Sequence, residues 1–122
     1  MDDILKESIL DSIRKLLGPE DDYTHFDSDI AIHINSAINR LYQLGLDTAK
    51  GFRVNSSDQT WDELFGSNDD VIDMAKSWIY LQVKMKFDPP TSSIAADAFK
   101  SEIDKLEWCI NVWIESNRKE FE

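Results

Sequence analysis

The sequence has few of the residues on which small catalytic or metal sites depend. It contains one cysteine, Cys109, and two histidines, so it forms no internal disulfide and has no Cys/His cluster with zinc spacing. Only four glycines occur, none of them in a phosphate-binding loop or a nucleophile elbow, and there is no HExxH motif. These absences argue against an enzyme, and we expect no cofactor.

Clusters of Lys and Arg are missing as well. The chain has 24 acidic and 13 basic residues, which gives a formal net charge of −11 and a pI near 4.5. Phosphate contacts need grouped basic side chains, so we expect no specific binding of DNA. Charged or amide residues interrupt every long apolar stretch, and charges recur within Met1 to Leu17, so we expect neither a membrane span nor a signal peptide.

Hydrophobic residues nevertheless make up 42% of the 122 residues, enough for a core in one domain spanning 1–122. Helical periodicity dominates. The prediction is an all-α fold, a small bundle of four main helices at about 2–17, 25–44, 68–87 and 92–117, with an irregular arm or short hairpin at 46–60.

The helix expected at 68–87 is the element around which the others pack. Its apolar side chains cover an arc of about 200°, which requires several neighbours. Ser67 is its expected N-cap, and Pro89 and Pro90 prevent it from continuing past Phe87. A structural turn then leads to the last helix and offers it N-caps: Asp88, Pro89, Pro90, Thr91, Ser92 and Ser93.

Two further helices precede the arm. The first, capped by Asp2 or Asp3 and ended by Gly18, has an apolar face of Leu5, Ile9, Ile13, Leu16 and Leu17. The second helix ends at Gly45, and its apolar face consists of Phe26, Ile30, Ile34, Ala37, Ile38, Leu41 and Leu44.

The irregular stretch at 46–57 carries apolar residues that a disordered linker would not usually contain. Phe52, Arg53 and Val54 have strand-like composition, so we expect a functional arm that contacts another subunit or partner. After it, Thr60 and Glu63 form a capping box for one helical turn, whose Trp61 and Phe65 return the chain to the core.

The last helix carries an anomaly. Its core stripe comprises Ala95, Phe99, Ile103, Leu106, Ile110 and Trp113, but Trp108 points about 180° away from it, with Val112 beside it. Either the loop or the first helix covers Trp108 within the same subunit, or Trp108 anchors another chain. Phe121, in the polar tail, is a further interface candidate.

Acidic residues between the first two helices raise the possibility of a calcium site. Glu20, Asp21 and Asp22 precede Asp27 and Asp29, but the glycine and the distant bidentate glutamate of an EF-hand are missing. A solvated loop with capping acids is the better interpretation. His25 and His33 lack a third ligand, so we assign them structural roles and predict no metal site.

Four stretches together resemble the head-tail connector, or adaptor, proteins of tailed bacteriophages and related prophage proteins. They are THFDSDIAIHINSAINRLYQLG (24–45), Thr60-Trp61, SWIYLQVKMKFDPPTSS (77–93) and KLEWCINV (105–112). The turn FDPPTSS joined to a helix with LEW is the most specific of them.

This resemblance implies a structural virion protein at the head-tail interface, made in the bacterial host cytoplasm. It implies a helical subunit that forms a ring under the portal protein, dodecameric on the portal and monomeric when free. The ring would extend the DNA channel, let DNA pass without specific binding, and receive further connector or tail-completion proteins. No catalysis and no membrane are implied.

Two alternatives come from the residues alone. A small acidic regulatory adaptor or DNA-mimic inhibitor would use the nine acids that face three bases in Met1 to Asp29. A metal-dependent enzyme is the third reading, and it would require stabilisation by calcium or magnesium.

Overall fold

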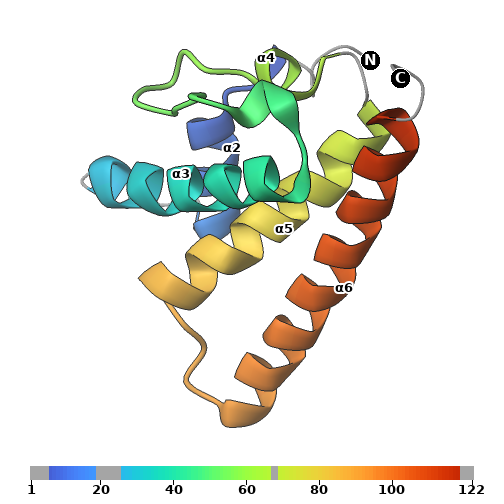
Figure 1. Cartoon of the computed structure of the whole chain (residues 1–122). Coiled ribbons are helices and arrows are strands. Elements are labelled where there is room, and N and C mark those ends of the chain that lie inside the picture. Colours follow the sequence, from blue (N-terminus) through green and yellow to red (C-terminus); the bar gives the residue numbers. More distant parts are fainter. Residues whose placement is uncertain (1–5, 19–25, 67–68, 119–122) are drawn as a thin grey trace.

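The structure is a computed structural model that describes residues 6–18, 26–66 and 69–118 (Figure 1). Within these ranges the chain forms helices and no strand, apart from one isolated β-bridge between Ser8 and Thr60. The prediction of a small all-α bundle with four main helices is confirmed. The elements are α2 (Ile9–Leu17), α3 (Asp27–Leu44), the 3-10 turn η2 (Asp47–Ala49), α4 (Trp61–Phe65), α5 (Asp69–Phe87) and α6 (Ser93–Arg118).

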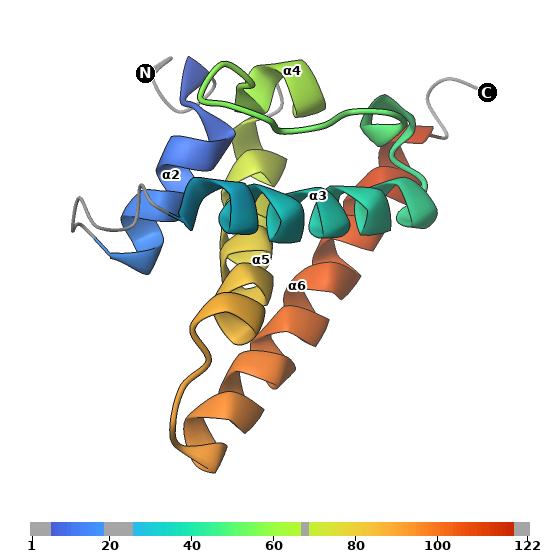
Figure 2. The same ribbon diagram turned by 90° about the vertical axis from the view of Figure 1, so that its left-hand side faces the viewer.

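Helix α5 lies at the centre of the bundle, as its wide apolar arc predicts. It contacts α2, α3, α4 and α6, and α3 crosses in front of it in Figure 2. Six of its side chains are completely buried: Val71, Ile72, Ala75, Trp78, Ile79 and Val83. The remaining helices therefore build one core around this element.

The proline turn ends α5 at Phe87, as predicted. The Asp88 N–H donates to the Lys84 carbonyl at 2.9 Å, and the Lys84 ammonium contacts the Asp88 carboxylate at 2.9 Å, so both close the last turn. Of the three candidate caps for α6, Ser92 is the one that caps the helix, because its Oγ accepts from the Ala95 N–H at 3.3 Å. Ser67, the expected cap of α5, lies outside the described residues.

Helix α2 begins at Ile9 in the described part of the chain and buries a face that differs in part from the predicted one. Ser8 is its N-cap, and the Ser8 Oγ accepts from the Asp11 N–H at 3.1 Å. Asp2 and Asp3, the predicted caps, lie outside the described residues. The chain just before α2 is extended because it pairs with the arm across the bridge to Thr60. Leu10 is buried, whereas Leu16 is 44% exposed, contrary to the predicted face.

Helix α3 follows its predicted pattern closely. Its buried residues are Ile30, Ile34, Ala37, Ile38 and Leu41. Gly45 ends it in the left-handed conformation at φ 115°, which a glycine adopts without steric cost. At its start, Phe26 packs edge-on against Phe87, with ring centroids 5.4 Å apart.

The arm between α3 and α4 is irregular and forms no hairpin with itself. Its last residues instead pair with the segment before α2, where the Ile9 N–H donates to the Gln59 carbonyl at 2.9 Å. The capping box of Thr60 and Glu63 is present, as predicted. Trp61 is completely buried, so α4 does return the arm to the core.

Candidate interaction surface

The outer side of α6 exposes apolar side chains along its length. Ile94 is 82% exposed, Trp108 67% and Val112 42%. At 100° per residue these three positions fall within an arc of about 40°, so they form one stripe on the side opposite the core. We call Ile94, Trp108 and Val112 the α6 stripe. With 67% of its side chain exposed, Trp108 is not covered by the arm or by α2 within the same chain, and its role as an anchor for another chain stays a prediction.

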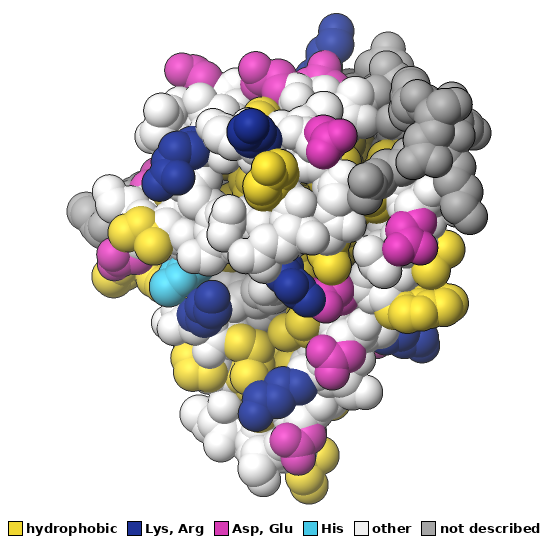
Figure 3. All heavy atoms as spheres, in the orientation of Figure 1, with side chains coloured by type: hydrophobic (Ala, Val, Ile, Leu, Met, Phe, Trp, Pro, Cys, Tyr) yellow, Lys and Arg dark blue, Asp and Glu magenta, His cyan; other side chains and the backbone are white. Residues whose placement is uncertain are grey.

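Charged side chains flank the α6 stripe. Asp97, Asp104 and Glu115 are exposed and follow one edge of it, and the exposed Lys105 lies at the other edge. A stripe of this kind, with an aromatic anchor and a charged margin, is typical of a protein contact surface. Figure 3 shows hydrophobic and acidic side chains together along the right-hand outline, where α6 lies.

The predicted arm residues differ in their environments. Val54 is 1% exposed and belongs to the core, and Phe52 is half-buried against it, so neither side chain lies on an open surface. Only Arg53 is exposed. Phe121, the remaining candidate, lies outside the described residues.

The side chain of Asn35 fixes the arm at Val54. Its amide nitrogen donates to the Val54 carbonyl at 3.0 Å, and its amide oxygen accepts from the Val54 N–H at 2.7 Å. This pair of bonds copies what a neighbouring strand would provide. The arm is therefore an ordered part of the subunit.

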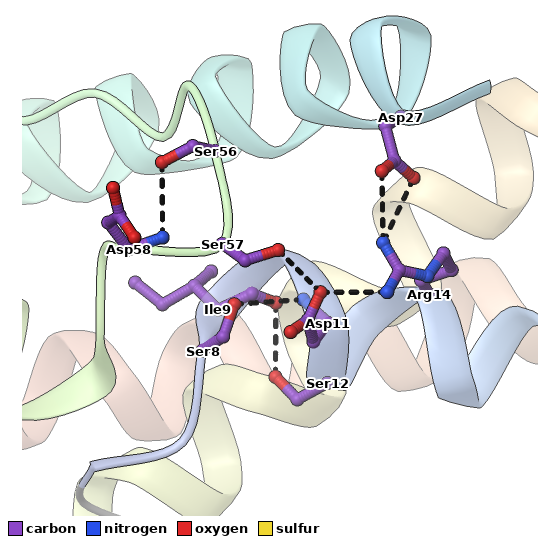
Figure 4. A network of polar contacts seen from close by, with 9 residues as sticks. All are labelled: Ser8, Ile9, Asp11, Ser12, Arg14, Asp27, Ser56, Ser57 and Asp58. Atoms are coloured by element: carbon purple, nitrogen blue, oxygen red, sulfur yellow. Dashed lines mark hydrogen bonds and ion pairs between the residues drawn. The ribbon is translucent and has the colours of Figure 1, made fainter. Parts of the chain in front are cut away.

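A second polar network fastens the tip of the arm to α2 and α3 (Figure 4). The Ser57 hydroxyl donates to Asp11 at 2.8 Å, and Asp11 also accepts from Arg14 at 2.8 Å. A second nitrogen of Arg14 donates to both carboxylate oxygens of Asp27 at 3.0 and 3.1 Å. One guanidinium thus holds together two of the acids on which the alternative readings depend.

A pocket of about 300 Å³ lies beside this network. It is lined by Leu10, Asp27, Ser28, Ala31, Asn55, Ser56 and Ser57. Asp27 is its one ionisable residue, and Arg14 already neutralises that carboxylate. In the described part of the chain, no group of three His, Cys, Asp or Glu side chains is placed to hold a metal ion. His33 is half-buried on α3, and His25 falls outside the described ranges.

The outer side of α3 is a surface that sequence reasoning missed. Ile32 is 60% exposed and Tyr42 41%, and the exposed side chains between them include Ser36 and Asn39. Residues 30–57 contain one acid, Asp47, against three Lys or Arg, in a chain that is strongly acidic elsewhere. The run without acids from 30 to 46 is the longest in the sequence and could have revealed this surface.

Figure 3 shows this side of the molecule. The surface over α3 is mostly uncharged, with Lys and Arg side chains above and below it. Lys50 and Arg53, both exposed, supply charge from the arm. We call Ile32, Ser36, Asn39, Lys50 and Arg53 the α3 face.

One ion pair joins α3 to α6 between these two surfaces. The Arg40 guanidinium donates to both oxygens of Glu107, at 3.1 and 3.2 Å. The hydrogen bonds and the charge of Glu107 raise the pKa of Arg40 above its ordinary value, so Arg40 stays charged at any physiological pH. This bidentate contact fixes the two helices relative to each other.

These features define a small helical protein with exposed apolar side chains on α6 and on α3. The chain belongs to the phage connector protein family, which matches it over residues 9–117. The family consists of structural proteins, so the resemblance seen in the sequence is confirmed at the level of a phage connector. No curated protein and no solved structure matches the chain significantly. No described helix has the length and apolar character needed to cross a membrane.

Proposed function

We propose that the protein is a subunit of a ring that sits beneath the phage portal, extends the DNA channel and joins the head to the tail. The observation that carries this proposal is the family match over residues 9–117, which includes α2 to α5 in full and α6 up to its last residue. The ring is part of the virion, and its partners are the portal protein and the next connector or tail-completion proteins.

The surface chemistry supports a role in assembly. A ring requires heterologous contacts, in which one patch of a subunit meets a different patch of the next. The α6 stripe offers an exposed aromatic anchor for such a contact, 67% exposed at Trp108. The net charge of −11 suits a channel through which DNA slides without being retained.

The structure gives less support to a DNA mimic. Such an inhibitor needs free carboxylates at phosphate-like spacing on one face. Two described acids of its proposed region, Asp11 and Asp27, instead accept hydrogen bonds from Arg14. Two carboxylates that share one guanidinium carry a net charge of only −1 between them and are a weak substitute for phosphates.

Electron microscopy of the protein mixed with the portal protein of the same phage tests the proposal. We expect an additional ring of density on the side of the portal that faces the tail. Portal particles that stay unchanged at an excess of the protein would refute it. Binding of the protein to a nucleic-acid enzyme, weakening steeply with salt, would favour the DNA-mimic reading instead.

A further inference from the structure

We propose that the α6 stripe of one subunit docks on the α3 face of a second copy of the same chain. This inference rests on the proposed ring and names the two surfaces that meet in it. The contact is heterologous, because the α6 stripe and the α3 face share no residue. Each subunit then has one surface of each kind to offer its two neighbours.

The charges of the two surfaces are complementary. Asp97, Asp104 and Glu115 border the α6 stripe, whereas Lys50 and Arg53 provide the exposed charge of the α3 face. Acids facing acids would repel, and residues 30–57 contain a single acid, Asp47, although the exposed Asp29 lies one turn before Ile32. The acidic edge of the α6 stripe on one copy should therefore be repelled least by the α3 face of a second copy.

The apolar parts fit the same arrangement. Trp108 and Val112 on one side and Ile32 on the other are exposed in the subunit, and their burial would add favourable apolar contact. Around Ile32 the exposed side chains of Ser36 and Asn39 are uncharged, so covering them costs less than covering ions. Charged residues are depleted at the centre of protein interfaces, so uncharged surroundings suit the burial of the Trp108 indole.

The α6 stripe and the α3 face also lie on different sides of the molecule, as two neighbours in a ring require. Both helices pack on α5, α3 in front of it and α6 along its other side (Figures 1 and 2). Their outer sides consequently face different directions. Because both helices pack on the same element, α5, their relative orientation is set by the core, and the Arg40–Glu107 ion pair adds a surface link between them.

DNA is the other occupant that a basic patch suggests, but the α3 face suits it poorly. Of its three nearby cations, Arg40 is already paired with Glu107. Lys50 and Arg53 alone provide too few phosphate contacts for stable binding at physiological salt. We therefore assign the α3 face to a neighbouring subunit.

Cross-linking between two cysteine variants tests the contact. Both carry Cys109→Ser, which removes the native thiol; one, with an affinity tag, also carries Ser101→Cys on the exposed side of α6, and the other carries Ser36→Cys on α3. The two are mixed in equal amounts, assembled on the portal and treated with a short bismaleimide. We expect a product that joins one tagged and one untagged subunit. As a matched control, Ser77→Cys on the exposed side of α5 replaces Ser36→Cys and should give at most a few per cent of that product.

The outcomes separate the two proposals. Rings that form without the mixed product, or that give mainly tagged pairs linked through Ser101→Cys, would overturn the docking contact and leave the ring intact. Absence of rings with every variant, and with the wild-type chain, would overturn the proposed function and the contact with it. Adding Lys50→Glu and Arg53→Glu to the Ser36→Cys subunit should reduce the mixed product several-fold. An unchanged yield would contradict the complementarity of charge.

Discussion

At the scale of single residues, Ser12 shows how one polar side chain inside the core is satisfied. Among the described residues it is the one buried polar side chain, and its Oγ accepts from the Trp61 Nε1–H at 3.0 Å and donates to the Ile9 carbonyl at 3.0 Å. Ser12→Ala would leave the indole N–H of Trp61 buried without a partner. We expect a loss of about 1–3 kcal/mol in the free energy of unfolding, measured by urea denaturation.

Ser36→Ala is the matched control for Ser12→Ala. The same hydroxyl is removed there from the exposed side of α3, and the free energy of unfolding should change by less than about 0.5 kcal/mol. Equal effects at the two positions would show that the hydrogen bond from Trp61 contributes nothing specific.

Two tryptophans separate folding from assembly. Trp78 is completely buried and Trp108 is 67% exposed, so the same substitution should act on different properties. We expect Trp78→Ala to cost about 3–5 kcal/mol of stability. Trp108→Ala should leave thermal unfolding within a degree or two of the wild type and yet weaken ring formation on the portal, seen by electron microscopy. A large drop in the melting temperature of Trp108→Ala with normal rings would show that Trp108 serves the core instead.

Residue-level prediction from sequence succeeded where periodicity was unambiguous. Trp108 lies opposite a long and regular core stripe, so its exposure could be read from helical spacing alone. The buried face of α2 could not, because the burial of Ser12 is made possible by a hydrogen bond from Trp61, a residue 49 positions away in the chain. A tertiary partner of this kind leaves no local signal in the pattern.

At the scale of elements, the turn between α5 and α6 sets the direction in which the longest helix leaves the core. Pro89 and Pro90 restrict the chain mainly by limiting its unfolded conformations. Replacing both by alanine should lower the free energy of unfolding by about 1–2 kcal/mol and allow α5 to extend or fray. Urea denaturation measures the first effect, and hydrogen exchange at residues 84–96 measures the second.

Thr91→Ala provides the comparison for the proline variant. Thr91 is exposed in the same turn, and no hydrogen bond of its side chain contributes to the cap of α6. Its removal should be nearly neutral. Unaltered unfolding of the double proline variant would mean that the turn is determined by the packing of the helices alone.

The arm gives a second prediction at this scale. Asn35→Ala removes both hydrogen bonds to Val54 and should free the arm without unfolding the helices. Limited trypsin digestion reports this directly, because Lys50 and Arg53 are exposed cleavage sites within it. We expect cleavage there to be several-fold faster than in the wild type. The variant Asn39→Ala, at an exposed position on the same helix, should be cleaved by trypsin at the wild-type rate.

The arm also marks the limit of what sequence could tell about the elements. Its irregularity and its apolar content were evident, and the helices on either side end at Gly45 and begin after Thr60 as their capping residues indicate. Its partners were not evident, because Asn35 and the segment before α2 reach it from distant parts of the chain. The bridge between Ser8 and Thr60, which joins the segment before α2 to the end of the arm, was not evident for the same reason.

At the scale of the whole molecule, charge is divided unevenly in a way that composition hides. The net charge of −11 describes the chain as a whole, yet residues 30–57 are slightly basic. In the proposed ring, this division would lower the repulsion between acidic subunits that meet side by side. Because the longest stretch without acids, residues 30–46, lies mainly on α3, repulsion between two copies should be weakest where this helix forms the contact that we propose.

The last prediction concerns DNA, which the proposed ring must pass without holding. Fluorescence anisotropy with a labelled duplex at about 0.15 M salt should show no saturable binding by the wild-type protein, because few unpaired cations lie together on the described surface. Binding that fell linearly on a log–log plot against salt would contradict this. If such binding were lost in the variant Lys50→Gln with Arg53→Gln, DNA would be the ligand of the α3 face, and the assignment of that face to a neighbouring subunit would be wrong.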